Sequence, residues 1–328
     1  MKTSSFVLLF SLCLLVLHSQ GKQPVKIIFD TDMGPDYDDV GAIAVLHALA
    51  AQGECEILAC CASDGYATIA PTIDAFNHYF NRPDLPVGAA GNNAPDFSAG
   101  NHWNDSIVNR SFKEKKTNAD YPSAVAVYRK TLASQKNNSV TIITVGFVSN
   151  LADLLQSGPD EFSPLSGMEL VKKKVKRWVA MAGRFPEGGE FNVNRHPEAS
   201  HYVFQHWPTP ILFSGFEIGV SIFTGRRLAD EGSDNNPLAW AYRYNLDTYE
   251  GKKAAKRQSW DQTAVLCAVR NPEKYFYVVG PGKFVILENG QNAWDPDTNA
   301  SHHFLVHKYP YQKIADVIDE LMLYEPKP

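Results

Sequence analysis

A run of aspartates between a strand-like segment and a helix-like segment constrains this chain more than any other feature. The apolar residues of 25–29 predict a buried strand, and residues 39–51 carry apolar side chains at helical spacing. The aspartates around the turn between them are Asp30, Asp32, Asp36, Asp38 and Asp39. Carboxylates this crowded repel one another at neutral pH unless a positive charge lies among them. A hard divalent cation with oxygen ligands relieves that repulsion, so the turn predicts a metal site at the carboxyl end of a parallel strand.

An alternation of strand and helix patterns continues along the chain. We expect strands at 25–29, 56–61, 139–145, 178–181 and 211–214, and helices at 39–51, 71–79, 121–134 and 198–205 and from Ser149 onward. This rhythm predicts an α/β protein with a single open, mostly parallel β-sheet flanked by helices and a Rossmann-like core. The long polar loops 88–120 and 225–236 are expected to be binding loops or lids at the active-site edge.

The N-terminus has the pattern of a secretory signal peptide. Lys2 precedes an apolar stretch at 6–17, and small and polar residues follow it. That stretch is too short for a stable membrane span. We therefore predict that residues 1–21 are cleaved and that residues 22–328 form one exported domain, periplasmic or secreted.

Composition narrows the possible partners. The chain is 44% hydrophobic and 20% charged, which is typical of a soluble globular protein. Its net charge of −5 lacks the excess of positive charge that attracts a nucleic acid polymer or an anionic membrane, so neither is predicted as a stable partner. The cysteines beyond the signal match no zinc pattern, and we expect them to be buried free thiols. They are Cys55, Cys60, Cys61 and Cys267.

Three later segments also place polar residues where a strand ends or a helix begins. Residues 144–151 run from a strand into a helix through Gly146. Glu190 and Asn192 follow a pair of glycines, and Asp261 lies at the start of an apolar helix. Such positions in an α/β fold lie at one edge of the sheet, so we expect these segments to meet in one cleft.

Together with Asp30-Thr31-Asp32-x-Gly34 and the pair Asp38-Asp39, these segments make the chain resemble the inosine/uridine-preferring nucleoside hydrolase family. The resemblance extends from Lys26 to about Tyr311. Members of that family are calcium enzymes that hydrolyse the N-glycosidic bond of ribonucleosides and release ribose and the free base. The resemblance thus implies a small-molecule nucleoside substrate, a Ca²⁺ cofactor and a catalytic domain over residues 22–328. It also implies a possible homodimer or homotetramer.

The resemblance assigns the metal ligands residue by residue. Asp32 matches the ligand that also serves as general base, and Asp39 and Asp261 match two further ligands. The main-chain carbonyl of Val145 matches a backbone ligand. Because a carbonyl donor makes no demand on the side chain, valine is acceptable there.

The resemblance also assigns the ribose contacts. Asp38 matches the carboxylate that contacts the 2′-hydroxyl, whereas Glu190 and Asn192 match residues that bind ribose hydroxyls. The chain has two extra residues, Asp36 and Tyr37, that the family's short form lacks. Asp36 could therefore share the role of Asp38 or take it over.

One departure from the family concerns the leaving base. Many members carry a histidine just before the late aspartate as the proposed acid, and this chain has Trp260 there. An indole cannot serve as that acid, but its face can stack on a purine. Trp103 could supply the opposing face and His102 an acid. These residues favour purine nucleosides as substrates.

Two other functions remain open on the sequence. A strand followed by Asp-x-Asp also occurs in magnesium-dependent phosphatases, in which Asp30 would be the nucleophile. A non-catalytic exported protein that binds nucleosides or sugars would also use an acidic cleft. An EF-hand loop does not fit, because counting from Asp32 puts Ile43 where a bidentate glutamate is required.

Overall fold

The computed structural model describes residues 23–250, 256–296 and 300–327. The predicted signal peptide, residues 1–21, lies outside the described residues. Within these ranges ten strands form one sheet in the order β3-β2-β1-β4-β5-β7-β12-β10-β11-β6. The prediction of an open, mostly parallel sheet flanked by helices is confirmed.

The sheet has a parallel part and an antiparallel part. The parallel strands are β1 (Val25–Thr31), β2 (Cys55–Ala62), β3 (Val87–Gly88), β4 (Val140–Thr144), β5 (Val175–Met181), β7 (Ile211–Ser214) and β12 (His302–His307). The antiparallel extension consists of β10 (Phe276–Ile286), β11 (Asn292–Asp295) and β6 (Glu187–Gly188). Two short strands, β8 (Phe223–Thr224) and β9 (Arg257–Gln258), pair separately.

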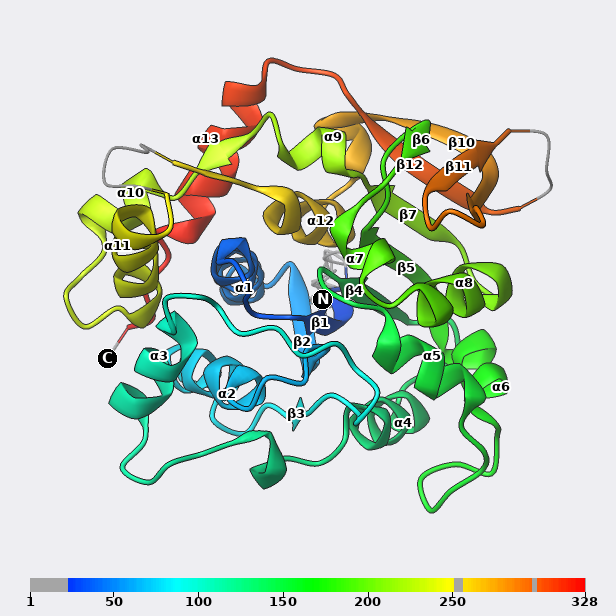
Figure 1. The fold of residues 1–328 in the computed structure, drawn as a ribbon, viewed down its shortest axis with the longest axis horizontal. Helices are drawn as coiled ribbons and strands as arrows, with labels where there is room; N and C mark the ends of the chain where they lie inside the picture. The colour runs from blue at the N-terminus through cyan, green and yellow to red at the C-terminus, as the bar shows by residue number, and fades with distance from the viewer. Residues whose placement is uncertain (1–22, 251–255, 297–299, 328) are drawn as a thin grey trace, which may run out of the picture.

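Helices cover both faces of the sheet, as Figure 1 shows. One face carries α1 (Asp38–Ala51), α2 (Ile69–Tyr79), α12 (Trp260–Val269) and α13 (Tyr311–Met322). The other carries α4 (Ala124–Ser134), α5 (Ser149–Gln156), α6 (Gly167–Lys174) and α8 (Pro197–His206). The remaining helices are α3 (Trp103–Ser111), α7 (Phe191–Asn194), α9 (Phe216–Gly219), α10 (Arg226–Glu231), α11 (Pro237–Thr248) and the 3₁₀ turns η1 (Asn118–Asp120) and η2 (Pro272–Lys274).

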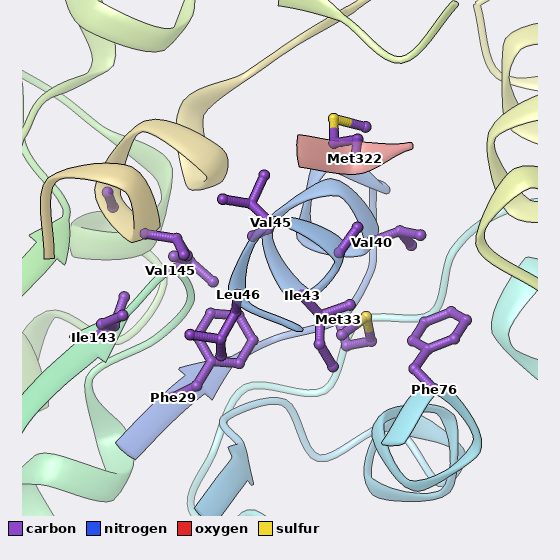
Figure 2. Packing of buried hydrophobic residues seen from close by; sticks show 14 of the residues in the cluster. Phe29, Met33, Val40, Ile43, Val45, Leu46, Phe76, Ile143, Val145 and Met322 are labelled. Atoms are coloured by element: carbon purple, nitrogen blue, oxygen red, sulfur yellow. The ribbon is translucent and has the colours of Figure 1, made fainter. Parts of the chain in front are cut away.

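Helix α1 is almost completely enclosed. Its residues from Asp38 to Leu49 are all buried, because α12, α13 and the sheet surround it. Figure 2 shows its apolar side chains, among them Ile43 and Leu46, above Phe29 of β1. A helix that is apolar all round is typical of a position inside a core. The first residues of α1 therefore have a fixed position relative to the end of β1.

The antiparallel extension reaches back to the middle of the chain. β11 pairs with β6, and the Asn292 side chain both accepts a hydrogen bond from Arg184 N (2.8 Å) and donates one to Arg184 O (2.7 Å). The segment that leads into Glu190 is thereby held by a strand more than one hundred residues later in the sequence. The sequence patterns did not predict this extension.

The two long loops are more ordered than their composition indicates. Loop 88–120 contains α3 and η1, and loop 225–236 contains α10. The four described cysteines are buried and free, as predicted. Among the described residues, no helix combines the length and the apolar character needed to cross a bilayer.

Candidate active site

A pocket lies where α1 and α12 begin, next to the carboxyl ends of β1, β4 and β5. Its volume is about 320 Å³, which falls in the range of small-molecule sites. The predicted site residues that line it are Asp32, Asp36, Asp38, Val145, Glu190, Asn192, Trp260 and Asp261. The structure therefore brings together side chains from distant parts of the sequence.

The aspartate turn is held in shape by the loop that carries α3. Met33 and Gly34 have φ values of 42° and 115°, in the left-handed region, which lets the chain turn sharply after β1. The Asn104 amide donates to the Met33 carbonyl (3.0 Å), and a Cβ on Gly34 would lie 2.7 Å from that amide. Trp103 Nε1 donates to the Asp36 carbonyl at 3.1 Å. The turn is thus fixed although its carboxylates repel.

Asp39 lies close enough to Asp32 for its charge to raise the pKa of Asp32. Oδ1 of Asp39 accepts hydrogen bonds from the Thr31 hydroxyl and from Met33 N at 3.1 Å. Its Oδ2 is buried and receives no hydrogen bond from the described residues. Asp39 lies next to the pocket without lining it. A buried, unpartnered carboxylate oxygen is costly unless a proton or a cation binds it.

The acidic side chains of the site raise one another's pKa. Burial first, and Asp39 next, raise the pKa of Asp32 well above its usual value. Burial and then Asp38 do the same for Asp261, and burial with Asp36 raises the pKa of Asp39 to about 6. A bound cation would reverse these shifts, because it favours the ionised carboxylates.

The donor set fits a hard cation in its chemistry. Asp32, Asp39 and Asp261 supply carboxylates and Val145 a carbonyl, all oxygen ligands of the kind that Ca²⁺ or Mg²⁺ takes. Among the residues described, no three side chains of the types His, Cys, Asp and Glu are grouped closely enough to hold a metal ion in this structure. The fit therefore rests on the oxygen chemistry and on the unpaired Oδ2 of Asp39.

A short helix, α7, positions Glu190 and Asn192 in the pocket wall. The Glu190 carboxylate caps α7, accepting hydrogen bonds from Gly183 N (3.2 Å), Asn192 N (2.8 Å) and Val193 N (3.2 Å). Burial nevertheless raises its pKa to about 7. The Asn192 amide donates to the Val145 carbonyl at 3.1 Å. This bond ties the predicted backbone ligand to a predicted ribose contact.

Arg257 is a pocket residue that sequence reasoning missed. It comes from β9, three residues before Trp260, and its side chain is only 7% exposed. It forms ion pairs with Asp36, with Asp38 (3.2 Å) and with Glu250 (3.0 Å). A single arginine beside a predicted site segment was the only signal for it in the sequence.

Aromatic side chains also line the pocket. Trp260, which the sequence analysis had singled out, lines it together with Phe191, Phe216 and Tyr249. Trp260 Nε1 donates to the Phe216 carbonyl at 2.9 Å, and the two rings lie 5.5 Å apart. The indole orientation is therefore fixed. An acidic floor beside an aromatic wall can bind a polar sugar and a flat ring in one ligand.

Two predicted residues are not brought to the pocket, and their expected roles need correction. Trp103 is fully buried and donates to the Asp36 carbonyl, so it supports the aspartate turn and cannot stack on a ligand here. His102 is exposed, and its Nδ1 lies 3.1 Å from the Asp105 carboxylate, outside the pocket lining. The loop does reach the site, but the direction of each side chain is set by tertiary contacts.

An open parallel sheet with an acidic, aromatic-walled pocket at its carboxyl edge defines an α/β protein that acts on a small polar ligand. A family profile described as "Inosine-uridine preferring nucleoside hydrolase" matches residues 27–309. The chain therefore belongs to this family, and it is an N-glycosidase of the nucleoside hydrolase type. The family and the enzyme class that the resemblance implied are confirmed.

Individual relatives differ in what their names say about the base. The chain is 31% identical to the pyrimidine-specific ribonucleoside hydrolase RihA of Salmonella agona, over 59% of this chain and 61% of RihA. It is 29% identical to an uncharacterized protein of Schizosaccharomyces pombe, over 70% of this chain and 74% of that protein. The match to RihA thus spans less than two thirds of that enzyme's length.

Solved structures show the same fold at low identity. The purine-preferring ribonucleoside hydrolase from Gardnerella vaginalis superposes with a TM-score of 0.69 at 16% identity, covering 90% of this chain and 98% of that one. At this identity the likeness establishes the fold alone. The proteins similar to this chain thus include one named pyrimidine-specific, which is similar in sequence, and one named purine-preferring, which is similar in fold.

Proposed function

We propose that this chain is an exported, calcium-dependent nucleoside hydrolase that prefers purine ribonucleosides and releases ribose and the free base. The observation that carries the proposal is the meeting of Asp32, Asp38 and Asp261 in one pocket that Trp260 also lines. The family reaction supports the chemistry. The all-oxygen donor set supports a hard cation over a soft one.

In this proposal Asp32, Asp39, Asp261 and the Val145 carbonyl hold the ion. When bound, Ca²⁺ would bind neighbouring ribose hydroxyls and orient a water molecule. Calcium acidifies water much less than zinc does, so a protein carboxylate must accept the proton. We assign the role of proton acceptor to Asp32, which lines the pocket and is also a proposed metal ligand.

The remaining polar residues are assigned to the ribose. Departure of the base gives the sugar ring positive charge in the transition state, as in other glycosyl transfers. Asp36, Asp38 and Glu190 surround the pocket with carboxylates that would stabilise this charge, and Asn192 adds an amide. A site that excludes part of the water strengthens each of these interactions.

The preference for purines is supported by the aromatic wall. A purine has the larger ring system and gains more from stacking on Trp260 and its neighbours than a pyrimidine does. The names of the relatives point in both directions, so the base is the part of the proposal that most needs measurement.

The two competing functions receive less support. In a phosphatase Asp30 would be the nucleophile, but its Oδ2 accepts hydrogen bonds from the Tyr128 hydroxyl (2.8 Å) and the Asn150 amide (3.0 Å). Asp30 is fully buried and does not line the pocket. A binding protein without catalysis would not require Asp32, whereas the proposed hydrolase does.

The proposal is tested with a panel of nucleosides assayed for reducing-sugar release, with calcium and with an excess of chelator. We expect inosine and guanosine to be cleaved faster than uridine, and chelation to abolish activity. Asp32→Asn should lower kcat by about 10²–10⁴-fold, because it removes the general base. Asp84→Asn, an exposed aspartate outside the pocket, serves as the control and should retain full activity.

Specific outcomes would overturn parts of the proposal. Activity that survives full chelation contradicts the metal, and equal rates on uridine and inosine contradict the purine preference. Hydrolysis of a chromogenic phosphate ester in place of inosine would favour the phosphatase.

Export and a dimeric or tetrameric state belong to the same proposal. Sequencing the N-terminus of the mature protein and sedimentation velocity test them.

A further inference from the structure

The pocket contains a buried, positively charged side chain, Arg257, to which the family resemblance gives no role. Arg257 lies beside the acidic floor, and its guanidinium is hydrogen-bonded on three sides. Nη1 donates to Glu250 (3.0 Å), and Nη2 donates to Asp36 and to Asp38 (3.2 Å). Nε also donates to Asp38, at 3.4 Å.

This arginine is not arranged to attract an anionic substrate. Its single positive charge faces three carboxylates, so the surroundings of the guanidinium are negative overall. A buried arginine with this many charge-assisted bonds is typical of a residue that fixes the carboxylates around it. The function of Arg257 therefore has to be sought in what it holds.

Arg257 contacts one oxygen of Asp38 with two of its nitrogens. Oδ1 of Asp38 accepts both bonds from Arg257, and Oδ2 accepts a long bond from the backbone N–H of Asp261 at 3.4 Å. Asp38 begins α1 and Asp261 lies in the first turn of α12. The Asp38 carboxylate thus connects the two helix starts that carry the proposed metal ligands Asp39 and Asp261.

Asp36 has an oxygen left over. Arg257 occupies its Oδ2, and Oδ1 accepts no hydrogen bond from the described residues. The Asp36 side chain is 35% exposed and lines the pocket, whereas that of Asp38 is 3% exposed. Because Asp36 lines the pocket, a carboxylate oxygen of this residue without a protein partner is suited to accept a hydrogen bond from a ligand hydroxyl.

We infer that Arg257 is a positioning residue that locks Asp38 between α1 and α12, and that Asp36 is the carboxylate that receives the ribose 2′-hydroxyl. The inference rests on the proposed function. It replaces the assignment of Asp38 that the family resemblance implied. The aromatic rings of Tyr37 and Trp260, each 5.2 Å from the guanidinium carbon, hold Arg257 from the sides.

The test compares a ribonucleoside with its 2′-deoxy analogue in Asp36→Asn, Asp38→Asn, Arg257→Lys and Arg257→Met. For each protein we measure kcat and KM with both nucleosides. We also measure the Kd of the ribonucleoside and of its 2′-deoxy analogue in an Asp32→Asn background, where turnover is suppressed. Circular dichroism and melting temperature show whether each variant is folded. The wild type should prefer the ribonucleoside, because the deoxy ligand lacks the hydroxyl that would donate to Asp36.

If the inference holds, Asp36→Asn reduces the ribo/deoxy ratio of kcat/KM and of Kd at least 10-fold. Asp38→Asn keeps that ratio while kcat falls. Arg257→Met should lower kcat about 100-fold and reduce the ratio, since Asp36 loses its partner. Arg257→Lys should restore part of both, because it keeps the charge but not the planar fork.

Opposite results overturn the inference. A ratio that survives Asp36→Asn but collapses in Asp38→Asn would return the 2′-hydroxyl to Asp38. Arg257 variants that only lower the melting temperature, with kcat and the ratio unchanged, would reduce Arg257 to a structural residue. A wild type that releases no base contradicts the proposed function alone, because the Kd ratio still reports on Asp36.

Discussion

His47 lies in the middle of α1 with no exposed surface, although its ring is polar. Its Nε2 lies 3.0 Å from Asn77 Oδ1, and the ring stacks on Phe80 with the centroids 4.2 Å apart. Burial, with a smaller contribution from Arg82, lowers the pKa of His47 to about 3. The folded protein therefore keeps this residue neutral at pH values where an unfolded chain would protonate it.

His47 should make the protein less stable in acid. The folded pKa is lower than the unfolded one, so its contribution is fully present above about pH 6.5 and is lost as the pH falls. Between about pH 7.5 and about pH 5 the expected loss of unfolding free energy is about 2 kcal/mol. Urea unfolding at a series of pH values gives the slope of the unfolding free energy against pH. This slope should be flatter in His47→Gln than in the wild type, and it should be unchanged in His201→Gln, which replaces an exposed histidine. Equal slopes in wild type and His47→Gln would contradict the assignment.

Some residues of the site could be predicted from the sequence, and others could not. Asp32 and Asp261 were predictable because carboxylates at a strand end and a helix start point to one edge of the sheet. Arg257 was not, because nothing in its sequence context distinguishes a buried counter-ion from a surface arginine. The stacking role predicted for Trp103 was wrong for a related reason. Its residue type is suited to stacking, but its tertiary contacts bury the side chain in the interior.

At the scale of elements, the ends of β1 and β4 approach each other through a glycine. β4 ends at Thr144, and Gly146 lies against the turn that follows β1. A Cβ at Gly146 would lie 2.4 Å from the backbone nitrogen of Asp32 and 2.6 Å from Ser63 Oγ. Both distances are shorter than any stable contact, so one of the two elements would have to move.

Gly146→Ala should therefore displace the proposed base. We expect an overpacking cost of about 1–3 kcal/mol and a loss of kcat/KM of about 10²-fold, because a shift of about 1 Å at a reacting group is enough for that. Gly158→Ala, where a Cβ would meet nothing within 4 Å, is the matched control. Thermal melts and kinetics of both variants check this, and a fully active Gly146→Ala would refute the close approach.

At the scale of the whole molecule, the pocket gathers more acid than it neutralises. Five acidic side chains line it against one arginine, and the pocket is built from segments far apart in the chain. An unfolded chain would not hold these carboxylates together. A cation that binds the assembled site therefore stabilises the folded state by mass action.

Calcium should raise the melting temperature of the purified protein. At a concentration about 100 times its Kd the gain is about 2.7 kcal/mol, which corresponds to about 4 °C for a chain of this size. Chelator should reverse the shift, and Asp261→Asn should weaken it. Differential scanning calorimetry measures both. An unchanged melting temperature with calcium, magnesium or chelator would argue against a structural role for any such ion.

The parallel half of the fold could be predicted, and the antiparallel half could not. Buried parallel strands such as β1 and β4 read as continuous apolar runs, and the helices between them have a clear period. β10 contains Gly280 and Pro281 in its interior, and these two residues disguise a strand. β6 has only two residues, so its place in the sheet depends entirely on pairing with β11.

The pairing of β11 with β6 also bears on how the molecule is made. A ribosome delivers the aspartate turn early, but the strand that clamps Arg184 beside Glu190 emerges only with Asn292. Domains tend to fold as their segments leave the exit tunnel. The nascent protein can therefore assemble its first parallel strands before the pocket wall that carries Glu190 is held in place. Competence for catalysis would arrive in the last tenth of synthesis.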